Sequence, residues 1–232
     1  DVISLEVSEA QCYCEIQFDD ALRPTVIFVS EKSIYFEIPF GEKRKVLTPK
    51  AFSGNCHVIA ARFLYESELG IRRNLALNPY DGFVRKGFFP HTETNTDLQI
   101  DETFAPRNAI DGVWANISHG KFPYQSWGTN KRDDAEWKLL FGKDVYIDEF
   151  PITLRSDFPH DNYWSTIEIE FSDGTYERRN LERTIEPQRF MIEKKKISWL
   201  ILKNLKLSDA HPLFPALTQF EVWGILIDEN LS

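Results

Sequence analysis

Short runs of β-branched and aromatic residues recur along the chain, and turn-forming residues separate them. In the first third of the chain, these runs predict strands at 12–18, 25–29, 33–38, 44–47 and 55–63. Charged pairs, prolines and glycines lie between the runs, as is typical of strand ends. The pattern changes near 65–72, which is compatible with one helical turn. We therefore expect a small β-rich domain over residues 1–72.

Strand-like runs continue in the second half at the spacing of a β-sandwich. They predict strands at 135–141, 145–155, 165–171, 175–179, 197–207 and 218–227. Asp173 and Gly174 lie between two alternating runs and predict a tight antiparallel hairpin. The polar stretch 91–101 has no period and predicts a loop. Because no helix of crossover length separates the strands, the pattern excludes a parallel α/β sheet and predicts an all-β jelly-roll or similar sandwich over 73–232.

The composition narrows the range of partners. Apolar residues make up 42% of the 232 residues and aromatic residues 14%, which excludes a disordered chain. The net charge is −9, so the overall field repels phosphate backbones and anionic lipids, and we expect neither nucleic acid nor a membrane as a partner. The best apolar run, 197–202, is far shorter than the roughly 18 residues of a membrane span.

Three cysteines bear on the cellular compartment. Cys12 and Cys14 are two positions apart in a predicted strand, so they share a face but are poorly placed to bridge each other. An odd and sparse count favours reduced thiols, and hence a cytoplasmic location. A bridge from one of them to Cys56 would instead indicate an extracellular protein, and the sequence leaves this alternative open.

Several motifs of the second half occur in a known order. They are the segments 74–76 (Asn-Leu-Ala), 108–112 (Asn-Ala-Ile-Asp-Gly), 126–127, 135–142, 154–155, 171–175 and 221–224. In this order the chain resembles the discoidin family, also called the coagulation factor five/eight type C domain, over about two-thirds of its length. This galactose-binding-like jelly roll includes many carbohydrate-binding modules, so the resemblance implies a non-catalytic carbohydrate-binding domain over 73–232. The segments 119–128 and 157–164 also resemble a group of bacterial proteins described as carbohydrate-binding.

Two loop-like segments carry side chains suited to a neutral sugar, which needs a flat apolar surface for its ring and planar donors and acceptors for its hydroxyl groups. Loops without a binding or catalytic role tend to carry small polar side chains, so the aromatic and planar polar side chains of these two segments indicate a binding role. We expect ligand-binding residues at His119, Tyr124, Trp127, Arg155, Asp157, His160, Asn162 and Trp164. We expect Tyr124 to be the exposed platform. The resemblance places His119, Arg155 and Asn162 where the family holds its sugars, in loops at one end of the sandwich.

Some of these residues have an equally good structural interpretation. Trp127 fits packing beneath the loops as well as it fits a sugar platform. Trp164 begins a predicted strand and could close the core. Arg155 and Asp157 could form an ion pair that staples a loop. The sequence leaves each of these pairs of alternatives open.

A structural calcium ion is a further hypothesis for the loop 108–116. Ca²⁺ prefers about six to eight oxygen ligands, and a turn that contains Asn108 and Asp111 can direct backbone carbonyls and a carboxylate to one point. In the family that the chain resembles, a glutamate of the closing strand completes such a site, and Glu221 matches it. The apolar segment 113–115, however, replaces the usual oxygen-rich continuation. The ion would hold the loop in place and would not react.

Signals for catalysis are sparse, because the sequence has neither a phosphate-binding loop nor a nucleophile elbow. A glycan hydrolase that uses His160 and Asp161 remains an alternative, although these residues could equally form a capped turn. A protein-interaction module with exposed aromatic residues is the third alternative. The other histidines, His57, His91 and His211, lack metal-ligand spacing, and we expect them to be ordinary surface or strand residues.

Overall fold

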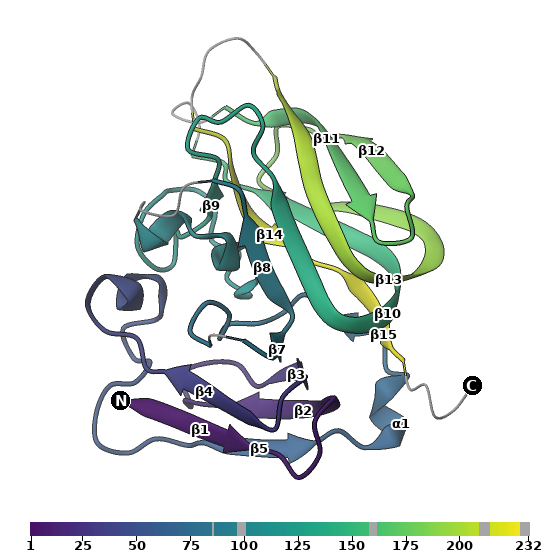
Figure 1. Cartoon of the computed structure of the whole chain (residues 1–232). Coiled ribbons are helices and arrows are strands. Elements are labelled where there is room, and N and C mark those ends of the chain that lie inside the picture. Colours follow the sequence, from purple (N-terminus) through teal and green to yellow (C-terminus); the bar gives the residue numbers. More distant parts are fainter. Residues whose placement is uncertain (85, 97–100, 158–161, 209–213, 228–232) are drawn as a thin grey trace.

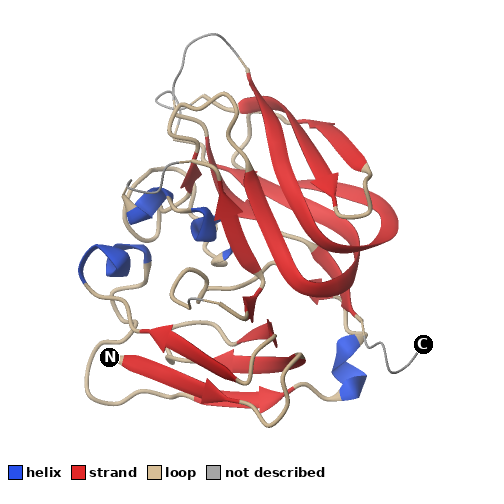
Figure 2. Ribbon diagram, in the orientation of Figure 1, coloured by secondary structure: helices blue, strands red, loops and turns tan. Residues whose placement is uncertain are grey.

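The computed structural model describes the chain except for residues 85, 97–100, 158–161, 209–213 and 228–232. Two β-rich parts lie one below the other in Figure 1. We call the lower part, built from β1–β5 and β7, the first module, and the upper part, built from β6 and β8–β15, the sandwich. Strands dominate both parts, and the helices are short (Figure 2). The prediction of an all-β fold is confirmed.

The first module consists of two small antiparallel sheets around one core. β1 pairs with β4 in one sheet, and the other has the order β5-β2-β3-β7. The rings of Phe18, Phe36 and Tyr80 meet in the core, with centroids 5.0–5.7 Å apart. The strands of the module are β1 (Val2–Glu6), β2 (Cys12–Gln17), β3 (Thr25–Val29), β4 (Ser33–Glu37), β5 (Ala60–Phe63) and β7 (Phe88–Phe89).

The sandwich pairs its strands antiparallel throughout the described residues. β11 and β12 form the predicted hairpin, in which Glu170 lies opposite Tyr176, and Gly174 supplies the positive φ of 82° that the turn requires. The strands are β6 (Arg73–Asn74), β8 (His91–Thr94), β9 (Trp127–Gly128), β10 (Trp137–Leu154), β11 (Trp164–Phe171), β12 (Tyr176–Asn180), β13 (Gln188–Leu207), β14 (Ala216–Phe220) and β15 (Trp223–Leu226).

The long strand β10 joins the different parts of the sandwich. Its first half pairs with β8, and its second half pairs with β14 and β15. The register shifts next to Gly142, where the strand bends between these partners. Gly142 has a φ of 74°, and a Cβ at this position would overlap the Phe89 ring of the first module, so a glycine is required there. The strands predicted separately at 135–141 and 145–155 are therefore one bent strand.

The two cores do not divide at residue 72. Leu75 and Ala76 belong to the core of the sandwich, whereas Tyr80, Phe83 and Phe88 belong to the core of the first module. The chain thus enters the sandwich, returns to the first module and leaves it again at β8. Tyr80, Phe83 and Phe88 thus complete the core of the first module, and this long-range contact has no local signature in the sequence.

Several local predictions need correction: the strand predicted over 218–227 is the two strands β14 and β15, and β13 begins well before 197. The segment 44–47 is not a strand, because Gly41–Val46 forms the 3-10 helix η1, in which only Val46 is buried. The strand predicted over 55–63 is limited to β5, which is exposed along its length. The segment 91–101 is not entirely a loop, because β8 pairs with β10. In β8, Thr92 is buried and Glu93 exposed, so polar residues provide the alternation of a half-buried strand.

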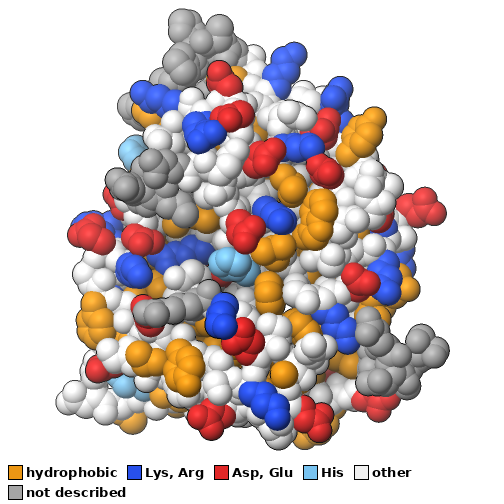
Figure 3. Space-filling view, viewed as in Figure 1, with side chains coloured by type: hydrophobic (Ala, Val, Ile, Leu, Met, Phe, Trp, Pro, Cys, Tyr) orange, Lys and Arg blue, Asp and Glu red, His pale blue; other side chains and the backbone are white. Residues whose placement is uncertain are grey.

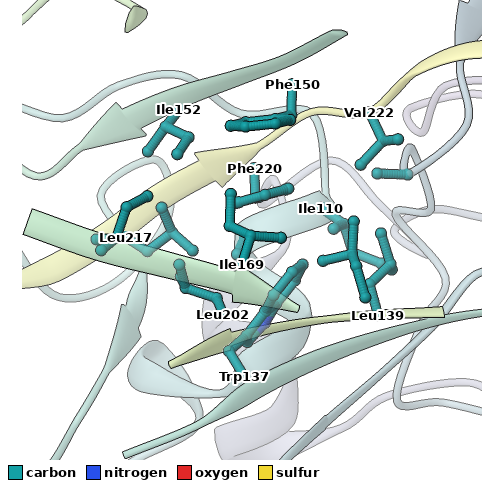
Figure 4. Close-up of a cluster of buried hydrophobic side chains, with 14 of the residues drawn as sticks. Ile110, Trp137, Leu139, Phe150, Ile152, Ile169, Leu202, Leu217, Phe220 and Val222 are labelled. Atoms are coloured by element: carbon teal, nitrogen blue, oxygen red, sulfur yellow. The ribbon is translucent and has the colours of Figure 1, made fainter. Parts of the chain in front are cut away.

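Large side chains fill the interior of the sandwich (Figure 4). Trp137 and Phe150 both pack against Phe220, with ring centroids 5.2 Å and 6.0 Å from it. The indole Nε1 of Trp137 donates to the backbone oxygen of Pro106 at 3.0 Å. Pro106 begins the short helix η3 (Pro106–Ile110), which follows η2 (Glu102–Phe104). The core therefore anchors the loop region at the end of the sandwich.

Apart from η1, the helical structure outside this region is, in the described residues, the single turn α1 (Glu66–Leu69), which links the first module to β6. Among the described residues, none of the helices is both long enough and apolar enough to span a membrane. The three cysteines are free thiols, and the Sγ atoms of Cys12 and Cys14 lie 3.8 Å apart on β2. Burial raises the pKa of Cys14 to about 12, so its thiol is protonated at neutral pH.

A buried carboxylate connects β10, β13 and the segment that precedes β6. Glu149 Oε1 accepts a hydrogen bond from Arg189 Nε at 2.5 Å, and Oε2 accepts one from Arg72 Nη2 at 2.6 Å. The bond from Arg189 lowers the pKa of Glu149 more than burial raises it, and the bond from Arg72 lowers it further. The Arg72 guanidinium also lies 5.3 Å from the Trp223 ring. Glu149 thus fixes three segments that are distant in sequence.

We predict that Glu149→Gln lowers the free energy of unfolding at pH 7 by about 2 kcal/mol, because charge-assisted bonds become neutral ones. A carboxyl group with a lowered pKa stabilises the fold above its unfolded pKa of about 4.3, and this contribution is lost as the pH falls through the lower folded value. The difference in the free energy of unfolding between the wild type and Glu149→Gln, measured with urea, should therefore disappear below about pH 4. The control Glu42→Gln breaks an exposed pair with Lys45 and should change stability little at either pH. A constant difference across this range would contradict the prediction.

Candidate functional site

A cavity of about 1180 Å³ is lined by residues of the sandwich, mostly from its loops and strand ends, and by residues of the first module. Its walls come from η2 and η3, from β8, from the residues after β9, from the start of β11 and from the segment that leads into β14. Lys43 of η1 adds a wall from the first module. On the face shown in Figure 3, basic, acidic and histidine side chains lie among hydrophobic ones.

His119 lines this cavity and is held by Asp157. The ring Nδ1 donates to Asp157 Oδ2 at 2.6 Å, and the His119 side chain is 55% exposed. Because the carboxylate fixes Nδ1 as the donor, Nε2 is the ring nitrogen that can reach a ligand. The two predicted loop segments, 119–127 and 155–164, therefore meet through this pair.

Arg155 is buried at the inner wall of the cavity and holds the segment before β14. Its Nη2 donates to the backbone oxygen of Phe214 at 2.5 Å, and its backbone N–H donates to Ala216 at 2.9 Å. Its guanidinium carbon lies 5.8 Å from the Phe104 ring. Asp157, which the sequence also allowed as an ion-pair partner of Arg155, bonds the His119 ring. Arg155 thus positions an aromatic residue as well as lining the cavity.

Phe214 is an aromatic residue that the sequence reasoning missed. Its side chain lines the cavity, the residue is 54% exposed, and Lys131 Nζ lies 4.8 Å from the ring centroid. An exposed phenyl ring in a concave site offers the apolar surface that was expected from Tyr124. The signal in the sequence was an aromatic residue directly before Pro215, outside any alternating run.

Trp127 and Trp164 pack against each other beneath the cavity. Their ring centroids lie 6.0 Å apart, and both side chains are buried. Trp164 borders the cavity from below, whereas Trp127 is fully buried in the core of the sandwich. For Trp127 the structure therefore favours the packing interpretation, because a fully buried ring cannot cover a sugar.

The other predicted binding residues do not line the cavity in the described part of the chain. Tyr124 is half-buried, and its backbone N–H donates to Lys121. Asn162 is buried, and its Oδ1 accepts bonds from the Tyr163 amide at 2.7 Å and from the Ser208 hydroxyl. Asn162 thereby attaches the start of β11 to the end of β13.

His160 and Asp161, on which the hydrolase alternative rests, lie outside the described residues. Nothing in the described cavity therefore bears on the roles suggested for them. Among the described residues, Asp157 is the carboxylate nearest to them in the sequence, and it accepts a hydrogen bond from His119.

A second histidine–aspartate pair borders the cavity, although His91 was expected to be an ordinary residue. Its Nδ1 donates to Asp81 Oδ1 at 2.6 Å, and the His91 side chain is 36% exposed. The buried Asp81 carboxylate also accepts the Thr92 amide at 2.9 Å. Burial lowers the pKa of His91, but the hydrogen bond and charge of Asp81 raise it more, so the net shift is upward. The pairing arises from a long-range contact between β8 and residue 81.

The predicted calcium ligand Asp111 is occupied by amide donors. Its Oδ1 accepts bonds from the Val113 amide at 2.8 Å and from Gln219 Nε2 at 2.8 Å, and its Oδ2 accepts one from Gln125 Nε2 at 2.7 Å. Burial raises the pKa of Asp111 to about 7, although these donors lower it. Gln219 Nε2 also donates to the backbone oxygen of Asn108 at 2.8 Å. A side-chain amide therefore lies where the expected oxygen ligands converge.

Glu221 is likewise engaged by neutral donors. Its Oε1 accepts the Trp114 indole N–H at 3.0 Å, and its Oε2 accepts the Trp223 indole N–H at 2.9 Å. The Asn108 side chain faces elsewhere, since its Nδ2 donates to the backbone oxygens of Glu102 and Ser126. In this arrangement Asn108, Asp111 and Glu221 do not fit a calcium ion, because N–H donors take the positions that a cation would need.

Elsewhere, Asp19, Asp20 and His57 are the described residues whose ligand atoms lie close enough together to consider a metal. They belong to the first module. The Asp19 carboxylate accepts the amides of Ala21 at 2.8 Å and Phe52 at 2.9 Å, and it bonds His57 Nδ1 at 2.9 Å. These bonds give Asp19 the role of tying three loop segments together.

We predict that the melting temperature of the protein is the same in calcium and in a chelator. In Gln219→Glu, two carboxylates would face the Asn108 carbonyl, so the variant should melt several degrees lower in chelator, and calcium should restore part of the loss. The control Gln219→Met removes the same hydrogen bonds without adding an oxygen and should not respond to calcium. A wild-type protein that melts lower in chelator would show that the amide does not replace an ion.

The fold and the cavity define the chain as an antiparallel β-sandwich with a concave site among its end loops. No described protein family and no curated protein matches the sequence. Solved structures match part of the chain. A chitosan-binding module of a chitosanase/glucanase from Paenibacillus sp. IK-5 is 14% identical, with 66% of this chain and 99% of that chain covered and a TM-score of 0.44.

Two further structures match to a similar degree. The family 32 carbohydrate-binding module from C. perfringens NanJ, solved with galactose, is 15% identical and covers 57% of this chain and 91% of its own, with a TM-score of 0.43. A fucose-binding module from Streptococcus pneumoniae is 15% identical and covers 65% of this chain and 96% of its own, with a TM-score of 0.45. These matches describe a partial likeness of fold, and the ligands named belong to those proteins.

Proposed function

We propose that the protein is a non-catalytic carbohydrate-binding module whose site is the cavity at the end of the sandwich. The observation that carries this proposal is the exposed ring of Phe214 in one cavity with Arg155 and with His119, which Asp157 orients. A neutral sugar presents an apolar C–H face and a set of hydroxyl groups, and these are the two kinds of surface that the cavity offers.

The polar groups of the site are held in place before a ligand arrives. Asp157 orients the His119 ring, and Arg155 holds the backbone of Phe214. Fixed side chains lose little conformational entropy on binding, which favours affinity for a ligand that makes few contacts. Each hydrogen bond to a sugar replaces one to water, so the net gain in free energy is small. We expect dissociation constants in the millimolar to micromolar range, which correspond to binding free energies of about 4–8 kcal/mol.

The His119–Asp157 pair suits hydrogen bonding to a sugar. Asp157, which lies beside His119, already accepts that ring's N–H. The pair is therefore arranged to present a ring nitrogen to a hydroxyl group.

The test is a screen of the purified protein on a glycan array, followed by calorimetry with the best-bound glycan. We predict that Phe214→Ala and His119→Ala each weaken binding about 5- to 30-fold, which corresponds to roughly 1–2 kcal/mol, because one removes the apolar platform and the other a hydrogen-bonding group. Both side chains are more than half exposed, so the melting temperature should change little.

Two matched controls come from the same chain. Tyr176→Ala removes an exposed aromatic ring on β12, and His57→Ala removes a histidine of another histidine–aspartate pair; neither residue lines the cavity. Both variants should bind the glycan as the wild type does. Unchanged affinity in Phe214→Ala and His119→Ala together would place binding elsewhere, and the absence of any bound glycan would reject the proposed function.

A further inference from the structure

The cavity extends beyond the loops that carry Phe214 and His119. A second wall is formed by Lys43 of η1 and by Asp81 and Gly82 of the first module, together with His91 of the sandwich strand β8, which Asp81 holds. The volume of about 1180 Å³ exceeds the roughly 300–1,000 Å³ of most small-molecule sites. A single sugar unit placed against Phe214 would leave this wall without a ligand.

The first module is fixed to the sandwich where it forms this wall. The Phe122 amide donates to the backbone oxygen of Lys45 at 2.8 Å, which ties η1 to the loop after His119. On the other side, the Arg107 guanidinium carbon of η3 lies 4.1 Å from the Phe83 ring. A Cβ on Gly82 would lie 2.8 Å from Arg107 Cδ, so the close approach depends on this glycine. The wall is thus a fixed part of the cavity.

This wall contains the same kind of histidine–aspartate pair as the part of the cavity at His119. Asp81 holds Nδ1 of His91 at 2.6 Å, as Asp157 holds Nδ1 of His119 at 2.6 Å, so each ring has Nε2 as its remaining polar atom. Arg107 near the wall is paired with Glu102 at 2.8 Å. Charges that are paired in this way present hydrogen-bonding groups with little unbalanced charge, which suits a neutral ligand better than an acidic one.

We propose that the first module is part of the binding site, and that the cavity takes a neutral oligosaccharide, with one sugar unit at Phe214 and His119 and a later unit at His91 and Lys43. This inference rests on the proposed function of the same cavity, and it gives a role to residues 1–89. When one ligand contacts two separated groups of residues, it loses its translational freedom only once. The second contact therefore adds to the binding free energy, and the affinity depends on the length of the ligand.

The experiment is calorimetry with ladders of one to about six units of β-1,4-linked glucose, mannose, xylose, galactose and N-acetylglucosamine. The variants are His91→Ala and Lys43→Ala, with the melting temperature of each as a check of folding. Lys43 is exposed, so its variant keeps the test valid if His91→Ala destabilises the fold. Lys50→Ala is the control, because Lys50 is an exposed lysine just after η1 that does not line the cavity.

We expect the wild type to bind one ladder about tenfold or more tightly at three to four units than at one unit. His91→Ala or Lys43→Ala should reduce this gain with length at least threefold and leave the affinity for the single unit unchanged, whereas Lys50→Ala should behave as the wild type. Equal affinity at all lengths, or a gain that survives both variants, would overturn the inference and leave the proposed function standing. Failure to bind any ladder and any arrayed glycan would instead reject the proposed function.

Discussion

The contact between the two modules is the constraint on which the rest of the structure depends. The chain passes from the first module into the sandwich at Leu75, returns to the first core at Tyr80 and leaves it at β8. Because each core contains residues from both sides of these crossings, neither module can shift without opening its own interior. The wall that the first module adds to the cavity is held in place for this reason.

Within the cavity, charged side chains mostly serve to orient other groups. Asp157 and Asp81 each hold a histidine ring, and Arg155 holds a backbone carbonyl. An ionised group that is already bonded contributes little charge to a ligand but fixes the direction of its partner's free atom. This arrangement favours recognition of hydroxyl groups, whose donors and acceptors are distinguished by direction more than by charge.

Alternation and turn residues were sufficient to predict the all-β class, the hairpin at Asp173-Gly174 and most strands of the sandwich, because these features depend on neighbours in the sequence. They were not sufficient for β8, whose strand character depends on pairing with β10, or for the return of residues 78–89 to the first core. The same limit applies to the site. His119 and Arg155 were found from residue type, whereas Phe214 and His91 join the cavity only through contacts between distant segments.

The Gln219 amide that closes the loop at Asn108 and Asp111 determines the conditions under which this loop keeps its shape. A loop closed by an ion keeps its shape only where the surroundings supply that ion, so phosphate, citrate or a low-calcium compartment would loosen it. An amide that belongs to the chain is present in every molecule at constant stoichiometry. The loop can therefore form during folding itself, without an ion from the surrounding medium.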